Sequence, residues 1–519
     1  MDHSTDAFQW PEIRWPWRKL SREFKLAFLS ACGIGLIVHL YVFTNLLLGN
    51  DAANNTFHAN NYLTNGRWAL GFFSSFSTIY QMPVVIGLIS IVMIALTAGL
   101  TVKLLELSHP AAIVITSALL VSFPSVANTF AYMFTADPYF IALFMNTLAV
   151  WLTKKYRFGW IAAVGLITLA CGIYQAYICY AAGLLLFDCT LSLLKDAPVK
   201  QVLRRGIGYA AILIASLLAY ILITNLLLRY HQQSFASYRG MDTMGQFDLS
   251  AMLSAIPTAY RKFILSFIRW PYSPRFLQLA QFSVPLLFGG SLLYLTAAKK
   301  LYREPLRLLL GLVTVLLLPL ALDLIAVLNY SVDPHLLMIY AFVLFFVFTV
   351  KLTELAAQQL AAGGRRWAWL SAVSALCCCV IVWNNFCVCN VGYHALQTCY
   401  ENTFSTANRI VARIEELDGY TPGDPVAMIG SLPRSYYGIA KKYGPYSEAI
   451  HEMNQNLVLT RNFIAHYIGL PMPAPSAEQK AAVSASELVA SMPAWPAEGC
   501  TAMIDGVAVV RLGEGEKLS

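Results

Sequence analysis

The residues best suited to chemistry lie in one polar stretch, from Asp51 to Trp68, that directly follows a long apolar run. The stretch contains a carboxylate (Asp51), an imidazole (His58) and a guanidinium (Arg67), set among several asparagines. A carboxylate can accept the proton of an attacking hydroxyl group, and a planar guanidinium can bind a phosphate through two hydrogen bonds. The stretch therefore predicts proton transfer and anion binding at the end of a membrane-spanning helix.

A second carboxylate, Asp137, opens a later apolar segment in the sequence Thr135-Ala136-Asp137-Pro138. We expect Asp51 and Asp137 to lie at the same membrane face, where two acids can act as a general base or as an electrostatic pair. Alternatively, Asp137 only caps its helix beside Pro138. A purely structural role is less suited to Asp51, because an acid at the C-terminal end of a helix opposes the helix dipole.

Arg67 is the basic residue of this loop, in the sequence Asn65-Gly66-Arg67-Trp68. Glycine permits a tight turn, so Asn65, Arg67 and Trp68 are candidates for binding an anionic ligand. The alternative for Arg67 is a salt bridge to Asp51 or to a lipid headgroup. His58 either assists as a base or hydrogen-bond partner, or is simply solvated.

Further polar groups occur at the ends of other apolar segments. Tyr174 and Gln175 offer a hydroxyl and an amide that could bind a sugar, with helix packing as the alternative. Arg261 and Lys262 belong to a basic, aromatic and apolar stretch that either cradles a lipid-linked phosphate or anchors the chain at the membrane surface. Asp323 lies within an apolar run, where an acid either serves function or pairs with a neighbouring helix.

The composition indicates a protein embedded in a membrane. Of 519 residues, 58% are hydrophobic and 12% are charged, about half the charge of a soluble domain. The net charge of +8 is attributed to topology-determining loops, so we expect no binding to nucleic acid. Most of the eleven cysteines lie in apolar runs, and none has the spacing of a zinc site. Cys399 and Cys500 either form a disulfide or remain free thiols.

The apolar runs predict an all-α polytopic protein with about eleven membrane-spanning helices. The fifth and sixth come from one run that is too long for a single crossing, and Gly172 marks the expected turn. The predicted spans are 26–48, 82–102, 110–130, 137–153, 158–173, 174–194, 207–228, 283–299, 306–328, 336–356 and 368–388.

Loop charges predict the orientation. Residues 1–25 interleave tryptophan with basic residues, as in a cytoplasmic segment at the headgroups. Basic loops follow at 154–157, 195–205, 299–307 and 351–366, which the positive-inside rule places in the cytoplasm. The loops at 49–81 and 229–282, and the region 389–519, then lie on the other side. The predicted organisation is a cytoplasmic N-terminus, a membrane domain at 26–388 and a C-terminal domain at 389–519.

The C-terminal region has the composition of a soluble α/β domain. Apolar residues between 404 and 417 recur at helical spacing after Asn402 and Thr403, which are candidate helix caps. Residues 425–429 and 502–512 are expected to form strands, with a turn at Asp505-Gly506.

The motifs around Asp51, Asn65 to Trp68, Asp137 and Tyr174 together resemble the Gtr-type glucosyltransferases that modify bacterial O-antigen, which are membrane enzymes of the GT-C class. The resemblance covers about residues 26–430. It implies transfer of a sugar, in particular glucose, from undecaprenyl phosphate to a glycan at the periplasmic face of the inner membrane. It also implies Asp51 as catalytic base, Asp137 as a second acid and inversion at the anomeric carbon. Asp51 lacks the neighbouring acid of many relatives, so no metal or other cofactor is predicted.

Two other functions are compatible with a polytopic protein. A transporter or flippase for a lipid-linked sugar would place ionisable residues near the bilayer midplane and show repeated halves, whereas here the polar residues gather at one face. An O-antigen polymerase or ligase would also use arginines at the outer face, so the sequence does not separate this alternative from a glucosyltransferase.

Overall fold

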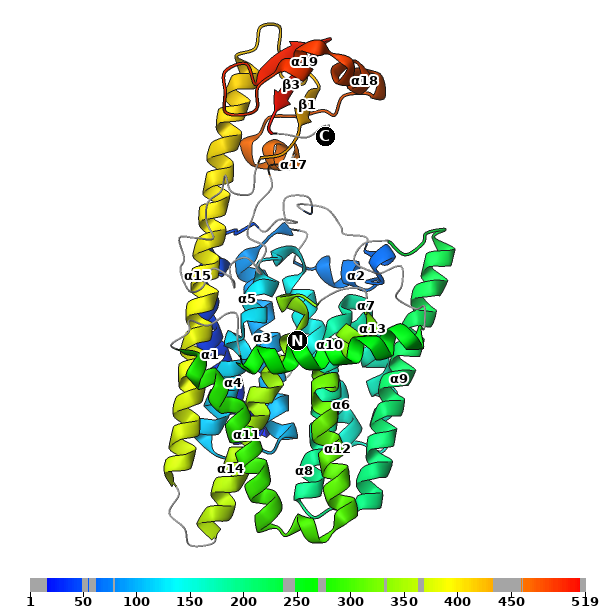
Figure 1. The fold of residues 1–519 in the computed structure, drawn as a ribbon, viewed down its shortest axis with the longest axis vertical. Helices are drawn as coiled ribbons and strands as arrows, with labels where there is room; N and C mark the ends of the chain where they lie inside the picture. Colours follow the sequence, from blue (N-terminus) through cyan, green and yellow to red (C-terminus); the bar gives the residue numbers. More distant parts are fainter. Residues whose placement is uncertain are drawn as a thin grey trace, which may run out of the picture.

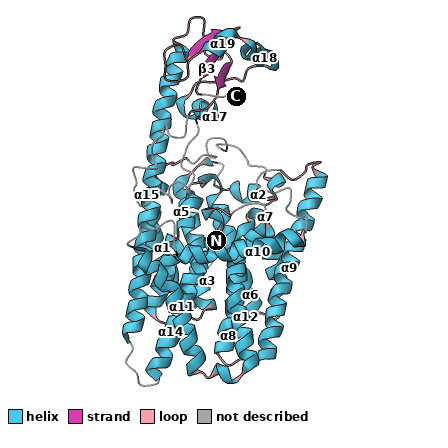
Figure 2. Cartoon of the chain, viewed as in Figure 1, coloured by secondary structure: helices cyan, strands magenta, loops and turns pink. Residues whose placement is uncertain are grey.

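The computed structural model describes residues 16–48, 55, 62–77, 80–236, 248–268, 277–330, 334–362, 368–432, 459 and 461–513. Within these residues the chain forms an upright bundle of helices, and a small α/β unit stands beyond one end of the bundle at the tip of a long helix (Figure 1). Figure 2 shows that helix dominates throughout and that strands occur in the small unit alone among the parts described. The predicted fold class is confirmed.

Within the described residues, ten helical segments are long and apolar enough to cross a membrane. A further apolar helix, α7 (Gly159–Ile173), has 15 residues and completes the predicted set of eleven. A short turn at Gln175–Tyr177 separates α7 from α8, so the fifth and sixth predicted spans are indeed separate helices. The ten comprise α1 (Arg22–Thr44), α3 (Pro83–Leu104), α4 (Pro110–Ser122) with α5 (Pro124–Phe130), α6 (Ala136–Lys155), α8 (Ile178–Leu194), α9 (Val199–Tyr230), α11 (Gln278–Ala298), α12 (Pro305–Leu322), α14 (Val343–Ala362) and α15 (Ala368–Glu415).

The two ends of the bundle differ in charge. The connections after α6, α8 and α11 and the helix ends beside them are rich in lysine and arginine, and we call their end the basic end. The opposite end holds the α5–α6 and α7–α8 connections together with Arg67, and we call it the Arg67 end. Lys351 departs from its expected place in a basic loop. It lies inside α14, where its Nζ is 2.8 Å from the Glu354 carboxylate and both side chains are buried.

One helix, α10 (Leu249–Ile268), lies across the bundle near the Arg67 end rather than along it (Figure 1). Its buried face carries Phe263 and Phe267, which pack on α14, where the Phe263 and Phe345 rings are 5.3 Å apart. Its other face exposes Ile264 and Ile268. The predicted basic, aromatic and apolar stretch is thus a helix with apolar residues on a buried and an exposed face, and both its predicted roles, a cradle for a lipid-linked phosphate and a membrane anchor, stay predictions.

The predicted span at 306–328 is broken near its end. Pro319 lies in the last turn of α12, and Asp323 separates this helix from the short helix α13 (Leu324–Leu328). A proline weakens the hydrogen bonding of the turn that contains it. Asp323 is fully buried at this break, and its predicted functional role remains untested.

Helix α15 has 48 residues and is therefore about 70 Å long, more than twice the roughly 30 Å hydrocarbon core of a bilayer. The expectation of a separate helix starting at Asn402 or Thr403 is wrong. The Thr403 hydroxyl does not cap a helix start but donates to the Cys399 carbonyl, 2.9 Å away in the preceding turn. Because no proline interrupts this stretch, the helix of the last span simply continues.

Polar contacts fix α15 to the bundle at the level of Tyr393. His39 of α1 lies 2.6 Å from the Tyr393 hydroxyl through Nδ1 and 2.8 Å from the Val121 carbonyl through Nε2. The Asn390 amide donates to the Val38 carbonyl at 3.3 Å. These buried bonds join three helices that are distant in sequence, so the long helix leaves the bundle at a defined position.

The C-terminal unit contains a three-stranded sheet in the order β1 (Val426–Ile429), β3 (Val507–Arg511), β2 (Thr501–Ile504). Strand β1 is parallel to β3, and β2 is antiparallel to β3. The predicted turn is confirmed at Asp505 and Gly506, which both have positive φ angles, 48° and 73°. Short helices surround the sheet: α17 (Arg461–Phe463) with the π-helical turn η14 (Ile464–Ile468), α18 (Ala477–Ala485) and α19 (Glu487–Ser491).

Cys399 and Cys500 are both buried, and no disulfide joins them in this structure. Cys399 lies on α15, and the Cys500 Sγ instead accepts a hydrogen bond from the Arg413 Nη1 at 3.3 Å.

Candidate functional site

Arg67 lies among tyrosines at its end of the bundle. Its Nη1 donates a hydrogen bond to the Tyr139 hydroxyl at 2.9 Å. Its guanidinium carbon is 5.2 Å from the ring centroid of Tyr174 and 6.0 Å from that of Tyr62. Burial works against the charged form, but the surrounding tyrosines outweigh it and raise the pKa of Arg67. Among the described residues Arg67 forms no ion pair with a carboxylate, so it presents a fixed positive charge.

The loop backbone places Arg67 through a tight turn. Residues Leu63–Asn65 form one turn of 3-10 helix, and Gly66 ends it with a φ of 69°. The Gly66 amide donates to the Leu63 carbonyl at 2.8 Å, and the Arg67 amide donates to the Tyr62 carbonyl at 3.0 Å. A glycine suits this position because other residues rarely adopt a positive φ. The expected tight turn before Arg67 is therefore present.

Trp68 is held against the end of α7. The amide of Ala69 donates to the Gly172 carbonyl at 2.9 Å. A Cβ atom added to Gly172 would lie 2.5 Å from the Trp68 indole, closer than carbon atoms can approach. The absence of a side chain at Gly172 thus lets the loop that carries Arg67 dock on the membrane helices.

Tyr174 and Gln175, from the α7–α8 connection, complete the cluster. The rings of Tyr139 and Tyr174 stack with centroids 4.1 Å apart and planes 13° apart. The Gln175 Nε2 donates to the Asn65 carbonyl at 3.0 Å and to the Tyr220 hydroxyl at 2.8 Å. Two separate motifs of the sequence therefore come together in the fold: Asn65, Arg67 and Trp68 from one, and Tyr174 and Gln175 from the other.

Asp137 lies two residues before Tyr139, in the first turn of α6. The N-cap position belongs to Thr135, so Asp137 is not the capping residue that the alternative interpretation expected. The carboxylate is 1% exposed and one of its oxygens, Oδ2, accepts a hydrogen bond from the Ser77 hydroxyl. The N-terminal end of a helix favours a negative charge at this position.

Several buried polar atoms of this cluster have no hydrogen-bond partner among the described residues. Two are donors, Arg67 Nε and Trp68 Nε1, and two are acceptors, Asn65 Oδ1 and Asp137 Oδ1. Most buried polar atoms in proteins are paired. Several unpaired polar atoms at one place therefore indicate a site where a ligand supplies the missing hydrogen bonds. The combination of donors and acceptors matches a ligand rich in hydroxyl groups, because each hydroxyl can donate and accept.

Two other predicted site residues, Arg261 and Lys262, lie on α10 and have no contact with this cluster among the described residues. Asp51 and His58 lie outside the described residues. Arg261 is exposed on α10, and the Lys262 ammonium donates to the Pro334 carbonyl. Within the described part of the chain, no group of three or more His, Cys, Asp or Glu residues could hold a metal ion.

Four cluster residues were not selected as site residues from the sequence: Tyr62, Ser77, Tyr139 and Tyr220. Tyr139 could be predicted from the sequence, because it lies close to Asp137 at the start of a membrane span. The sequence does not single out Tyr220, because it is one of three tyrosines along the long apolar helix α9.

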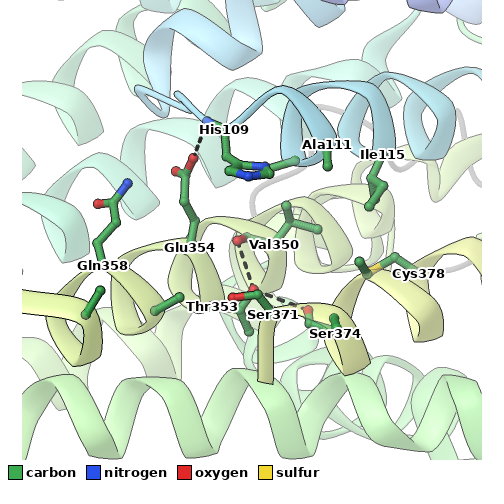
Figure 3. Close-up of a pocket in the computed structure, with 15 residues that line it drawn as sticks. His109, Ala111, Ile115, Val350, Thr353, Glu354, Gln358, Ser371, Ser374 and Cys378 are labelled. Atoms are coloured by element: carbon green, nitrogen blue, oxygen red, sulfur yellow. Dashed lines mark hydrogen bonds between the residues drawn. The ribbon is translucent and has the colours of Figure 1, made fainter. Parts of the chain in front are cut away.

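A cavity of about 480 Å³ lies elsewhere, at the basic end between α4, α14 and α15 (Figure 3). Its most polar group, Glu354, is satisfied by the protein. One carboxylate oxygen accepts from the amides of Ser108 and His109 at 3.0 and 2.7 Å, and the other pairs with Lys351. Alanine, serine and threonine side chains form most of the remaining wall. This cavity therefore has the character of a packing gap between helices, and the Arg67 cluster remains the candidate for chemistry.

Comparison with known proteins gives one result. The family model described as glucosyl transferase GtrII matches residues 40–346, more than half of the chain. The matched range contains the whole Arg67 cluster and ends within α14, before α15 and the C-terminal unit. No curated protein and no solved structure matches the chain.

Proposed function

Because the chain belongs to the glucosyl transferase GtrII family, and is therefore a membrane transferase with a sugar donor and an acceptor, we propose that it moves glucose from undecaprenyl phosphate to a surface glycan. The acceptor is a bacterial O-antigen or a similar polysaccharide. The Arg67 end faces the periplasm and the basic end faces the cytoplasm of the inner membrane, as the distribution of lysine and arginine favours.

The observation that carries this proposal is the bond from Arg67, an arginine without a carboxylate partner among the described residues, to the Tyr139 hydroxyl. Tyr139 lies at the start of α6, two residues after the buried Asp137. A polyprenyl-phosphate donor is a phosphodiester with one negative charge. When the bond from the anomeric carbon to the phosphate oxygen breaks, the departing polyprenyl phosphate gains a second negative charge. A guanidinium fixed at that place stabilises the charge as it develops.

On the acceptor side, a hydroxyl group of the glycan attacks the anomeric carbon and forms the new glycosidic bond. Its proton passes to a carboxylate within hydrogen-bond reach. The family resemblance assigns this base to Asp51, and Asp137 supports the reacting groups from the start of α6. A single displacement of this kind inverts the configuration of the anomeric carbon, and it needs no metal ion.

The unpaired donors and acceptors of Asn65, Arg67, Trp68 and Asp137 support a sugar as the bound group. Polar atoms of both kinds at one buried place can select among sugars, because a missing or inverted hydroxyl leaves one of them without a partner. Tyr139 and Tyr174 add aromatic faces beside them.

The proposal is tested in membranes that contain the full chain, with undecaprenyl-phosphate glucose as donor. The acceptor is polysaccharide from a host that lacks this gene, and mass spectrometry detects added hexose. We expect hexose with the wild-type chain and a loss of at least about 100-fold with Asp51→Asn at equal expression. Full transfer by Asp51→Asn removes Asp51 as the base, whereas no transfer by the wild-type chain rejects the assigned donor or acceptor.

A further inference from the structure

The C-terminal unit, which lies outside the family match, overhangs the Arg67 end of the bundle with α17 turned toward it (Figure 1). Phe463 and Ile464 of this unit belong to the same buried apolar cluster as Leu48 and Phe134 of the membrane domain. Cys399, on the part of α15 that has left the bundle, belongs to this cluster too. The unit is therefore packed against the membrane domain as well as attached to it by chain.

Arginines fix the unit to α15 and α17 to the sheet. The Arg413 Nη1 donates to the carbonyls of Pro496 and Ala497, both at 3.1 Å, and its guanidinium lies 4.8 Å from the Trp495 ring centroid. The Arg461 Nη1 donates to the Val426 carbonyl of β1 at 2.8 Å. A buried bond to His39 also holds α15 in the bundle, so the unit is attached to a helix that is itself anchored there.

An aromatic surface, formed by Tyr400, Phe404 and Tyr467, lies on this unit and on the emerging helix. Tyr400 is 6.1 Å from Phe404 and 6.2 Å from Tyr467 between ring centroids. Phe404 is 37% exposed, and the two tyrosines are half-buried. Tyr467 belongs to the π-helical turn η14, a rare conformation that is frequent at functional sites.

The aromatic surface is connected to the residues around Asp137. The Tyr467 hydroxyl donates to the Gln81 Oε1 at 3.4 Å, just before α3 begins. The neighbouring Tyr80 amide donates to the Ser77 carbonyl at 3.1 Å, and the Ser77 hydroxyl binds Asp137. Tyr62, which lies against Arg67, is also packed on the apolar cluster shared with the C-terminal unit.

The height of this surface favours a water-soluble occupant. Tyr393 is level with His39, five residues before the end of α1. Tyr400 lies seven residues further along α15, about 10 Å higher, and so just past the end of α1. A polyprenyl chain remains in the bilayer, whereas a glycan approaches the site from this side.

We propose that Tyr400, Phe404 and Tyr467 bind one saccharide unit of the acceptor glycan next to the reacting hydroxyl group. This assignment rests on the proposed function. An aromatic ring can pack against the apolar C–H face of a pyranose. The C-terminal unit thereby takes part in the choice of acceptor, although the family match does not include it.

The test compares Tyr467→Ala and Tyr467→Phe in the full chain, with undecaprenyl-phosphate glucose and polysaccharide from the host lacking the gene. We expect Tyr467→Ala to raise the KM for polysaccharide about tenfold, with the donor KM unchanged. Tyr467→Phe keeps the ring, loses the bond to Gln81, and should stay within about twofold of wild type. Tyr302→Ala, an exposed tyrosine at the basic end, is the matched control.

Phe404→Ala serves as the second variant, because this side chain is more exposed and its removal leaves the fold intact. We expect it to raise the polysaccharide KM about threefold to fivefold. An unchanged polysaccharide KM in both alanine variants overturns the subsite. An equal effect of Tyr467→Phe and Tyr467→Ala also overturns it, since the bond to Gln81 would then be the cause. A wild-type chain that transfers nothing rejects the proposed function instead.

Discussion

Tyr139 and Tyr174 stack at 4.1 Å between ring centroids, and the guanidinium of Arg67 lies against both rings. The three residues come from a loop, the start of α6 and the α7–α8 connection. Each ring attracts the cation through its π electrons, and the stack fixes the two rings relative to each other. The position of Arg67 is thus set by membrane helices, which a loop by itself could not achieve.

Replacement of Arg67 should weaken use of the donor. We expect Arg67→Ala to lower kcat/KM for undecaprenyl-phosphate glucose about 100-fold or more, because one charge on the departing phosphate loses its partner. Arg67→Lys should lie between alanine and wild type, since lysine keeps the charge but lacks the planar fork. Arg229→Ala, exposed at the end of α9, is the control. Equal donor dependence of Arg67→Ala and wild type contradicts a phosphate role.

The hydroxyl of Tyr139 should matter less than Arg67 but measurably. Tyr139→Phe removes the acceptor for the Arg67 Nη1 and keeps the stack on Tyr174. We expect a threefold to tenfold loss in kcat/KM for the donor, the effect of about 1 kcal/mol. Steady-state kinetics at varied donor concentration provide the measurement. A loss as large as that of Arg67→Ala would mean that Tyr139 touches the substrate itself.

Asp137 should be required for transfer but not for donor binding. Asp137→Asn keeps the size of the side chain and its contact with Ser77 while removing the negative charge. We expect kcat to fall by about 100-fold or more with an unchanged donor KM. Ser77→Ala leaves the charge but frees the carboxylate to turn, so a smaller loss in kcat is expected. If Asp137→Asn retains wild-type kcat, the carboxylate is only structural.

The sequence predicts the helices well because apolar runs and loop charges act locally. The separation of α7 from α8 follows from run length, and the turn at Asp505-Gly506 follows from residue type. It does not predict that α15 continues to Glu415, since Asn402 and Thr403 can either cap a helix or lie inside one. The outcome depends on packing against a unit formed by later residues.

The candidate site is predicted in part, for a similar reason. Asp137 and Tyr174 are predicted because each lies at the end of an apolar run, and Arg67 because it is the basic residue of the loop that follows the first run. Topology alone brings these places to one face. The contacts that join them involve Tyr139 and Gly172. These two residues matter because the loop that carries Arg67 lies close to α6 and α7 in space. Spacing along the chain contains no information about how close these parts lie in the fold.

Gly172 gives a direct test of the contact between the loop and the membrane helices. Gly172→Ala introduces a Cβ 2.5 Å from the Trp68 indole, so Trp68 and the turn before it must shift. We expect at least a tenfold loss in transfer, because a shift of about 1 Å misplaces Arg67. Gly165→Ala on the same helix is the matched control, since no atom lies within 4 Å of its added Cβ. Equal activity of the two variants would show that Trp68 does not position Arg67.

The orientation of the chain can be measured with two reporter fusions. The basic end carries Lys154, Lys155 and Arg157 around the α6–α7 connection. Short loops rich in lysine and arginine stay in the cytoplasm, so we expect the basic end to lie there. Helix α15 starts at the basic end and leaves the bundle at the Arg67 end. Alkaline phosphatase is active in the periplasm and inactive in the cytoplasm. We expect activity for a fusion after Ser519 and none for a fusion at residue 157. The reversed pattern would put the Arg67 cluster in the cytoplasm, where no periplasmic glycan can reach it.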